Sequence, residues 1–570
     1  APAARLPVNR ESRSWGKLVK FRDRDGQLKQ WNIPDAMFAG EGIEVIKGLA
    51  DRGLKISPHQ QATRKLQEYL RGVEVADRVQ LVDKMGWHDQ AFMLPDRVIG
   101  NPPEPLHYYA DAGTVCKMAR AGTLEGWRDN VAAYAVGNDL VAFAISAAFA
   151  GPLLDIVSRP TIGFHFYGSS SWGKSTLLGI AASVCGAPGQ HGYGHTWRAT
   201  DNAIESMAAA HSDCLFILDE LKQCDPRVVG QTVYMLGNGE GKARSAETGV
   251  SAGARHRWRL VVLSNGELTL ADHLSEARLK AHAGQEMRLL HIEANLNGTQ
   301  ELRARNGIYQ DVRDYAGGAA LSAHITMQAA QYHGTAFPAF LEQLLQPGFI
   351  EGKGRAWIAG KVSEFQQHAL TRQASGQASR AADAFGLVAA AGEMATRFGV
   401  TGWPQGTATK AALACFRAWL DYRGGEGDKE SRDILEAVRL HFAMYGESHY
   451  SRMNEGDPVV DEHAPRTMQR YGFRRTTDEG DNMTGRTSET VFFVLADPFK
   501  NEICKGHNPK HVAELLEAKG ALQRVEKDRF YQKRVLPGMG KRRVPCYVID
   551  LAALLDDGEE MPDENHRKAA

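Results

Sequence analysis

The sequence predicts an α/β fold in which a parallel β-sheet with flanking helices supports a phosphate-binding loop. Between residues 161 and about 295, apolar strand-like runs alternate with helical runs, as in parallel sheets with crossover helices. Residues 168–175, Gly-Ser-Ser-Ser-Trp-Gly-Lys-Ser, match the template G-x-x-x-x-G-K-[S/T] at every position. A third observation is an apolar run that ends in Asp219-Glu220, 45 residues after Lys174.

The loop lies between an expected strand, residues 162–167, and an expected helix that follows Ser175. Terminal glycines let backbone N–H groups turn toward an anion, and the helix N-terminus adds partial positive charge. We therefore predict that Lys174 reaches the β- and γ-phosphates of ATP and that the Ser175 hydroxyl binds Mg²⁺. The residues predicted to hold the nucleotide are Gly168, Ser169, Ser170, Ser171, Trp172, Gly173, Lys174, Ser175 and Thr176.

The composition is that of an ordinary soluble protein, and 570 residues are enough for three or four domains. Sixty-eight Lys and Arg balance 68 Asp and Glu, so the total charge does not indicate a polyanionic partner. Seven dispersed cysteines fit a reducing cytoplasm and argue against a disulfide framework or a structural zinc. Residues 140–156 are apolar but short for a bilayer, so we expect a buried helix, no membrane partner and a cytoplasmic location.

Residues 1–122 favour a small domain of mixed α and β structure. The runs 15–23 and 27–33 are joined by Asp25-Gly26, which predicts a hairpin. Residues 56–73 favour a helix that starts at Ser57-Pro58. The tryptophans, tyrosines and basic residues of this region could stack on nucleic acid or could form the core of a small β-domain.

Two further strands end in polar residues, which we expect at the carboxyl edge of the sheet, where ligands bind. Strand 215–218 leads into Asp219 and Glu220, and strand 259–264 leads into Asn265. Asp219 would hold Mg²⁺, and Glu220 would position and deprotonate the attacking water. Asn265 would contact the γ-phosphate, although Asn-Gly is also a common turn dipeptide.

Basic residues near these strands are candidates for contacts with DNA and with a neighbouring subunit. Lys242 and Arg244 flank a glycine-rich turn and could contact nucleic-acid phosphates, or could lie in a solvated loop. Arg288 precedes the strand-like run 289–292 and could reach the γ-phosphate of a neighbouring subunit. Arg278 is the rival candidate for that role, and an ordinary ion-paired arginine is the alternative for both.

The carboxyl-terminal third favours a helical lid over residues 301–425 and a winged-helix-like domain over 426–556. Residues 500–550 contain twelve Lys and Arg but six Asp and Glu, so this part is locally basic. Lys541, Arg542 and Arg543 would form a wing that contacts duplex DNA, although winged helices also bind proteins. We expect the tail, residues 557–570, to be disordered.

A set of motifs along the chain resembles the DUF927 family. The resemblance covers most of residues 12–350 and continues in 385–393 and 401–404. Its motifs include Trp15-Gly-Lys-Leu, Gly122-Thr-Leu-Glu-Gly-Trp-Arg, the loop 163–176, Trp197-Arg-Ala-Thr-Asp-Asn-Ala-Ile-Glu, Leu218-Asp-Glu, Gly241-Lys-Ala-Arg, Leu263-Ser-Asn-Gly-Glu and Ala283-Gly-Gln-Glu-Met-Arg.

The family is described as helicase-like ATPases of phages, plasmids and other mobile elements, similar to the ring-forming AAA+ helicases of superfamily three and the MCM type. The resemblance implies an AAA+ core over residues 123–300, the cofactors ATP and Mg²⁺, and single-stranded DNA in the pore of a hexameric ring. A primase partner or an upstream primase domain is also implied for some relatives. By the same resemblance, Lys174 and Ser175 are the Walker A pair, Asp219 and Glu220 Walker B, Asn265 sensor 1, Lys242 and Arg244 pore-hairpin residues, and Arg288 the arginine finger.

The leading hypothesis is therefore an ATP-dependent DNA helicase or translocase that acts as a ring in the replication of a mobile element. One alternative is an ATP-switched initiator or loader that remodels origin DNA without processive unwinding. A second alternative is a DNA-sensing ATPase in anti-phage defence. The sequence leaves the unwinding polarity, the ring size, the origin sequence and the role of residues 1–120 open.

Overall fold

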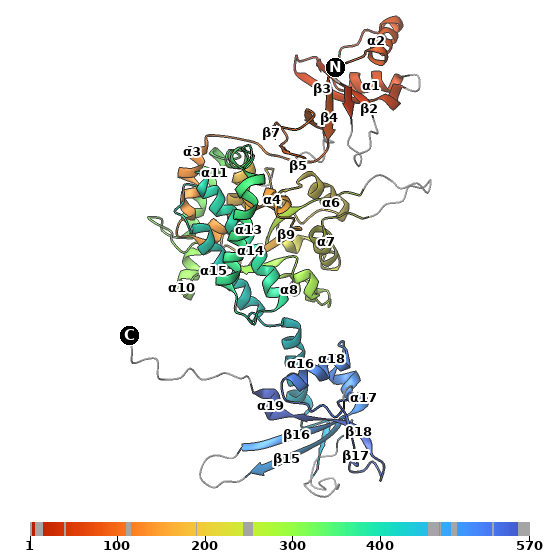
Figure 1. Ribbon diagram of the computed structural model, residues 1–570, viewed down its shortest axis with the longest axis vertical. Helices are drawn as coiled ribbons and strands as arrows, with labels where there is room; N and C mark the ends of the chain where they lie inside the picture. Colours follow the sequence, from red (N-terminus) through yellow and green to blue (C-terminus); the bar gives the residue numbers. More distant parts are fainter. Residues whose placement is uncertain are drawn as a thin grey trace. The chain divides into compact units, whose positions relative to one another are not determined.

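The computed structural model forms two compact units, residues 1–427 and 428–570 (Figure 1). It describes residues 3–5, 15–38, 42–109, 116–189, 191–242, 255–453, 467, 469–479, 487–526 and 529–556. Arg244 and the tail 557–570, for which we predicted a DNA contact and disorder, lie outside the described residues.

The first part of unit 1 holds a five-stranded sheet of order β3-β2-β1-β4-β8. Strands β2 (Trp15–Arg22) and β3 (Leu28–Pro34) form the antiparallel hairpin expected from the sequence. The carboxylate of Asp23 accepts the N–H groups of Asp25 and Gln27 and so closes the turn. The other elements are β1 (Ala3–Arg5), β4 (Arg78–Val82), β8 (Leu106–Tyr108), η1 (Asp35–Phe38), α1 (Ile43–Asp51) and α2 (Gln60–Gly72).

Two details of this part differ from the sequence-based expectation. Helix α2 begins at Gln60 rather than near Ser57, and α1 was not predicted. Helix α1 was not predicted because tertiary packing stabilises it. Its Val45 and Leu49 are fully buried with Trp31 and Ile33. A small antiparallel sheet follows, made of β5 (Gly86–His88), β6 (Ala91–Met93) and β7 (Val98–Gly100).

The central sheet of unit 1 is five-stranded and fully parallel, which confirms the predicted α/β class. Its order is β10 (His195–Thr196), β11 (Cys214–Asp219), β12 (Leu260–Gly266), β9 (Ile162–Tyr167) and β13 (Leu290–Glu293). The chain thus inserts β12 between β9, which leads into the phosphate loop, and β11, which leads into the acid pair. Asn265, near the end of β12, therefore lies between them.

Both faces of this sheet are covered by helices. On β11, Leu215 and Ile217 join one hydrophobic core, and Phe216 and Leu218 join another, as alternation along a strand requires. Figure 1 shows α13 and α14 on one side of β9 and α6 and α7 on the other. The helices before α13 are α3 (Leu124–Asn130), η2 (Ala132–Ala135), α4 (Asp139–Ile156), α5 (Lys174–Cys185), α6 (Asp201–Ala210), η3 (Leu221–Gln223), α7 (Pro226–Asn238), α8 (Leu270–Glu276), α9 (Ala283–Glu286), α10 (Gln300–Asn306), α11 (Gly318–Gln331), α12 (Ala336–Leu344) and η4 (Ile350–Gly354).

Helix α4 is long and apolar enough to cross a membrane, but 94% of it is buried inside the protein. It is covered by α14 (Gly376–Arg397) and α15 (Thr407–Arg423), and α13 (Arg355–Ala369) packs on α14. At Gly392 a Cβ atom would lie 2.1 Å from the Ser146 hydroxyl, so glycine permits the close approach of α14 to α4. Residues 301–425, for which we predicted a lid, thus share one hydrophobic core with the sheet and α4.

Unit 2 contains a five-stranded sheet of order β14-β15-β16-β18-β17. It also contains α18 (Pro509–Ala518), and the proposed wing residues 541–543 lie between β17 (Gln532–Arg534) and β18 (Val544–Asp550). The longer hairpin of β15 (Gly472–Glu479) and β16 (Thr487–Leu495) was not predicted, because the run Arg-Arg-Thr-Thr-Asp-Glu in β15 lacks apolar alternation. The other elements are α16 (Lys429–Tyr445), β14 (Tyr450–Arg452), α17 (Ala496–Pro498), η5 (Phe499–Ile503) and α19 (Leu551–Leu555).

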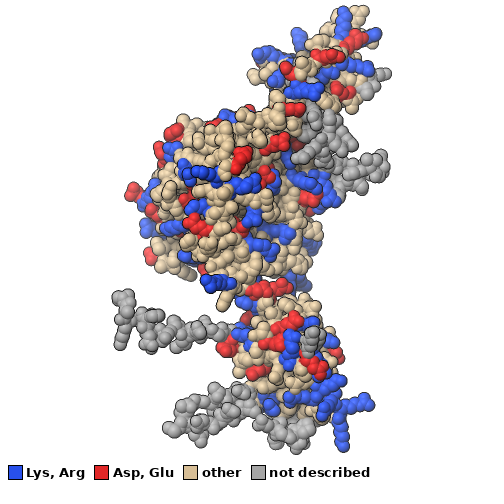
Figure 2. Space-filling model, in the orientation of Figure 1, with Lys and Arg blue, Asp and Glu red and all other residues tan. Residues whose placement is uncertain are grey.

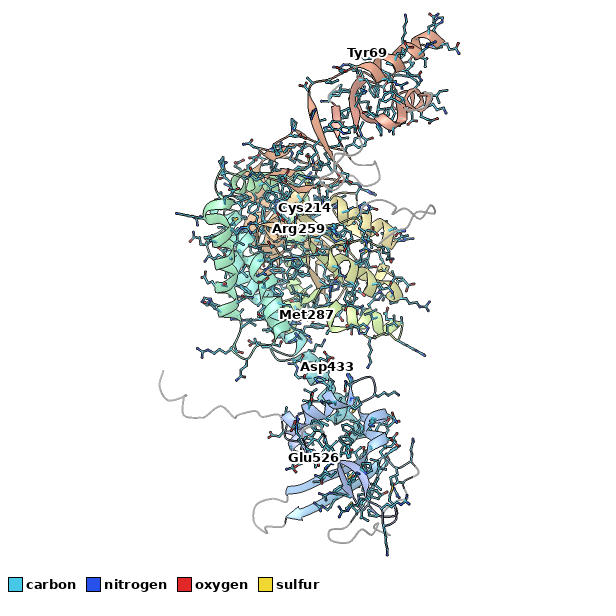
Figure 3. The ribbon with its side chains drawn as sticks, turned by 45° about the vertical axis from the view of Figure 1, so that its right-hand side comes forward. Tyr69, Cys214, Arg259, Met287, Asp433 and Glu526 are labelled. Carbon is cyan, nitrogen blue, oxygen red and sulfur yellow. The ribbon has the colours of Figure 1, made fainter. Side chains whose placement is uncertain are left out.

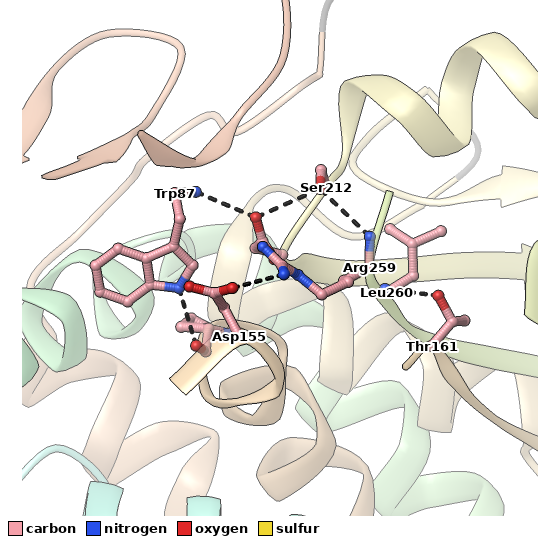
Figure 4. A network of polar contacts seen from close by, with 8 residues as sticks. Trp87, Asp155, Thr161, Ser212, Arg259 and Leu260 are labelled. Atoms are coloured by element: carbon pink, nitrogen blue, oxygen red, sulfur yellow. Dashed lines mark hydrogen bonds and ion pairs between the residues drawn. The ribbon is translucent and has the colours of Figure 1, made fainter. Parts of the chain in front are cut away.

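A polar network joins the β5–β6 hairpin to the amino-terminal edge of the central sheet (Figure 4). The carboxylate of Asp213, whose side chain is 3% exposed, accepts from Arg259 Nε at 2.8 Å and from the backbone N–H of Trp87 at 3.1 Å. Arg259 also pairs with Asp155 at the end of α4. Figure 3 places Arg259 close to Cys214, at the start of the neighbouring strand. The network therefore ties three segments that are distant in sequence.

We predict that Asp213→Asn lowers the free energy of unfolding by about 1–3 kcal/mol, because one acceptor of a buried charged network is lost. Asparagine tolerates the left-handed backbone of this position, φ 60°, so the effect reports the contacts. Urea unfolding followed by tryptophan fluorescence measures the loss. The control is Glu44→Gln in the exposed Glu44–Lys47 pair, which should cost less than about 0.5 kcal/mol. Equal losses in the two variants would contradict the account.

Candidate nucleotide-binding site

The phosphate loop connects β9 to α5 through two glycines that no other residue can replace without strain. Gly168 has φ 140°, and a Cβ there would lie 2.4 Å from the Trp172 ring. Gly173 caps α5 in the left-handed conformation, with φ 95°. The bulky Trp172 thus packs over Gly168 and leaves the loop backbone in place. The two ends of the motif are required by the shape of the loop itself.

Lys174 lies inside the loop with its charge held by main-chain oxygens. Its Nζ donates to the carbonyl oxygens of Gly168 and Ser169, both at 2.8 Å, and the residue is 8% exposed. Burial lowers the pKa of Lys174, whereas the nearby Glu267, Glu220 and Asp219 act in the opposite direction. Because no acid in the described part of the chain forms an ion pair with it, this cation is available to an anionic ligand.

A chain of hydrogen bonds connects the loop to the ends of β11 and β12. The Ser175 hydroxyl donates to Asp219 Oδ1 at 3.2 Å, and Asn265 Nδ2 donates to Ser175 Oγ at 3.4 Å. The backbone N–H of Glu220 donates to Asn265 Oδ1 at 2.7 Å. Asn265 is 2% exposed. The structure therefore brings together the five residues Lys174, Ser175, Asp219, Glu220 and Asn265.

Glu220 has a backbone conformation that glutamate rarely adopts, with φ 60° and ψ 81°. A non-glycine residue in this region carries a cost on the order of 1–3 kcal/mol, and such residues cluster at functional sites. The bond to Asn265 holds the strained peptide, and the half-buried side chain faces the loop. The strained backbone conformation therefore keeps the Glu220 carboxylate beside the phosphate loop.

Lys174, Ser175, Glu220 and Asn265 line a pocket of about 440 Å³ whose second wall comes from α10 and α11. The backbone N–H of Ile308 donates to Trp172 O at 2.9 Å and fastens this wall to the loop. The wall adds Arg305, Asn306 and Ser322, and β12 adds Glu267. Sequence reasoning missed Arg305, Asn306 and Ser322 because they lie 130 to 147 residues from Ser175 outside any motif, and only the fold brings them near. Glu267 closes the motif Leu263-Ser-Asn-Gly-Glu, but the sequence assigned it no role. A pocket of this size is in the range of small-molecule sites.

The residues present fit ATP with Mg²⁺. Backbone N–H groups at the start of α5 and the free charge of Lys174 suit phosphate. The hydroxyl of Ser175 and the carboxylate of Asp219 are oxygen ligands, and Mg²⁺ is typically bound by one or two such groups together with substrate phosphates. The described residues contain no cluster of three or more His, Cys, Asp or Glu that could hold a metal alone.

The two candidate finger residues, Arg288 and Arg278, lie away from the nucleotide pocket of their own chain. Arg288 donates to Asn238 Oδ1 at 2.9 Å and to Gly284 O at 2.7 Å, and its guanidinium covers the Tyr234 ring. Arg278 is exposed, with φ 58°. Neither residue lines the nucleotide pocket, so any role at a γ-phosphate would be toward another copy.

Those of the predicted DNA contacts that the structure describes are exposed, on both units. Lys242 pairs with Asp201 at 3.2 Å, and each side chain is at least a fifth exposed. In unit 2, Lys541, Arg542 and Arg543 lie exposed in the loop between β17 and β18. Figure 2 shows positive side chains gathered at this end of the unit. These contacts stay predictions.

Residues 6–256 match the model of a domain of unknown function, DUF927. This region is a DUF927 domain. The recognition made from the sequence motifs is thereby confirmed. The DUF927 match includes the phosphate loop, Asp219 and Glu220, and it ends before β12 and Asn265.

Among 72 matching chains of solved structures is one described as "SCCmec type IV Cch - active helicase". It aligns over 97% of this chain and 95% of its own, with a TM-score of 0.66 and 17% identity. The chain therefore shares its fold with a protein described as a helicase over nearly its whole length. The comparison with curated proteins found no match.

Beneath the site, His165 on β9 forms a buried relay. Its Nε2 donates to Leu268 O at 3.0 Å, so its Nδ1 accepts from the Ser264 hydroxyl at 2.9 Å, and Trp197 Nε1 donates to the same hydroxyl. Burial lowers the pKa of His165 to about 4. The unfolded chain, with an ordinary histidine pKa, therefore binds this proton first as the pH falls.

We predict that the free energy of unfolding is highest above about pH 6.5 and falls toward pH 4. The titration of His165 accounts for a loss on the order of 3 kcal/mol at pH 4. His165→Gln keeps a donor toward Leu268 and should flatten the dependence of Tm on pH in this window. The exposed His59→Gln controls for the loss of one histidine. An unchanged slope in His165→Gln, measured by calorimetry, would contradict the assignment.

Proposed function

We propose that the protein is a P-loop ATPase that uses ATP hydrolysis to move or separate DNA strands. The observation that carries the proposal is the hydrogen-bonded chain from Ser175 to Asp219 and, through Asn265, to Glu220. This chain joins the pair that we propose for Mg²⁺ and the base that we propose for catalysis, beside the phosphate loop. The fold shared with a protein described as an active helicase supports the DNA role.

Each residue has a separate task in this proposal. Bound ATP supplies the phosphoanhydride that is cleaved, and Mg²⁺ offsets phosphate charge. Lys174 and the loop N–H groups bind the β- and γ-phosphates, and Ser175 with Asp219 holds the metal. The Glu220 carboxylate orients a water molecule and takes its proton at an Oε atom. Asn265 keeps the Glu220 peptide in its strained conformation and presents its amide to the same space.

The DNA role assigns tasks to the basic residues. Lys242 and Arg244 would contact a strand as pore-hairpin residues, and Lys541–Arg543 would contact duplex DNA. We further propose a ring, hexameric by resemblance, in which an arginine of one copy reaches the nucleotide of the next. Arg278 is exposed for this task, whereas Arg288 must first leave Asn238 and Gly284. Replication of a mobile element is the proposed setting.

We expect Glu220→Gln to lower the ATP hydrolysis rate by about 100-fold or more, because the base is lost while the phosphate contacts remain. Its affinity for ATP, measured by calorimetry, should stay within a few-fold of the wild type. The control Glu276→Gln changes an exposed acid on α8 and should leave the rate unchanged. Equal hydrolysis rates for the wild type and Glu220→Gln would show that Glu220 does not act as the base.

Strand displacement on a forked DNA duplex, run with the same variants, separates helicase from loader. ATP-dependent displacement that Glu220→Gln abolishes is the expected result. ATP hydrolysis without strand displacement would contradict the helicase proposal and favour an initiator or loader.

A further inference from the structure

A second, larger cavity of about 850 Å³ lies in the helical part of unit 1. Its walls come from α13, the end of α14 and the first part of α15, and it shares no residue with the nucleotide pocket. Of its lining residues, only Glu393 belongs to one of the sequence motifs. We call it the helical groove.

Three cations from two helices line the helical groove without a partner. Arg397 is the last residue of α14, and Lys410 and Arg417 lie seven residues apart on α15, hence on one face of that helix. All three are exposed. No hydrogen bond or ion pair of their side chains occurs within the described residues, which include all of residues 255–453. Their charges are therefore open to a ligand.

The acids that line the same groove are already engaged. Glu364 pairs with Lys361 at 2.7 Å. The buried Glu393 carboxylate accepts from the N–H of Gly406 and from the N–H and hydroxyl of Thr409, each at 3.0 Å. Asp139 accepts from Gln310 Nε2 at 2.7 Å. The Glu393 carboxylate already accepts hydrogen bonds from the N–H groups at the N-terminus of α15. A ligand in the groove must therefore be bound by side chains.

The groove offers apolar side chains beside these cations. Trp357 on α13 is half-buried and lines the cavity, and Leu413 and Ala414 line it between Lys410 and Arg417. Cations that track a phosphate backbone, together with an aromatic ring on which a base stacks, are the elements of single-strand binding. A small inorganic anion would use the charges but would leave the indole and the large volume without a role.

We propose that the helical groove binds a single strand of nucleic acid, with phosphates on Arg397, Lys410 and Arg417 and a base on Trp357. This site is separate from Lys242, Arg244 and Lys541–Arg543. It extends the DNA role of the proposed function, but it requires no ATP hydrolysis. The two proposals can therefore fail independently.

The test uses the full chain without nucleotide and a fluorescently labelled oligo-dT of 20 residues, with binding measured by anisotropy. Arg397→Glu, Lys410→Glu and Arg417→Glu combined should weaken binding at least tenfold. The slope of log affinity against log salt should flatten by about 2, for three phosphate contacts on a single strand. The matched control reverses Lys353, Arg372 and Arg380, which are exposed in the same helical part outside the groove and should change affinity less than threefold.

A second variant set tests the base contact. Trp357→Ala should weaken binding of the normal oligonucleotide roughly fivefold or more but leave an abasic oligonucleotide unaffected, and Trp357→Phe should restore most of the affinity. An RNA of the same length identifies which sugar the groove accepts, and tighter binding of either strand supports the site. If the triple reversal does not fold, as judged by its melting curve, Lys410→Glu alone replaces it.

Equal affinity of the triple reversal and its control would overturn the groove while leaving the ATPase proposal intact. Absence of strand binding by the wild type would likewise overturn it. If Glu220→Gln hydrolysed ATP at the wild-type rate while the groove still bound the oligonucleotide, only the proposed function would be overturned.

Discussion

The side chain of Asn265 is the contact on which the site depends. Its amide oxygen holds the strained peptide of Glu220 at 2.7 Å, and its amide nitrogen reaches Ser175 in the loop. A buried amide satisfied on both sides fixes the separation of the groups that it joins. Without it, the Ser175 hydroxyl and Glu220, the proposed metal ligand and the proposed base, would have no common partner. The proposed catalytic arrangement is therefore as much a property of β12 as of the two motifs beside it.

The position of Asn265 follows from the order of the strands. All strands of this sheet are parallel, and parallel sheets are buried on both faces, which requires enough apolar surface on either side. Helix α4, covered by α14 and α15, supplies one face, and α6 and α7 supply the other. The helices after residue 355 thus support the sheet and also shape the helical groove. A single hydrophobic core positions two separate polar sites.

The sequence was sufficient for the elements with strong local signals. The strands 162–167 and 215–218, the loop glycines and the N-terminal hairpin lie where their patterns predicted. The polar residues at three strand ends were expected at one edge, and the structure brings them together; their roles stay predictions. Arg305 and Ser322 were beyond reach, because no local pattern announces a wall that only tertiary packing builds. The same holds for α1, for the β15–β16 hairpin with its polar strand, and for the convergence of α13 and α15 around Trp357.

The turnover of Asn265→Ala tests the central claim most directly. The account predicts a steady-state kcat for ATP at least about tenfold lower than in the wild type, since the hydrogen bonds of Asn265 to the Glu220 peptide and to Ser175 are lost. Binding of ATP should change little, because Lys174 and the loop backbone remain. A kcat equal to that of the wild type, in a variant with an unchanged melting temperature, would show that Asn265 does not connect the loop to Glu220 and would contradict the account.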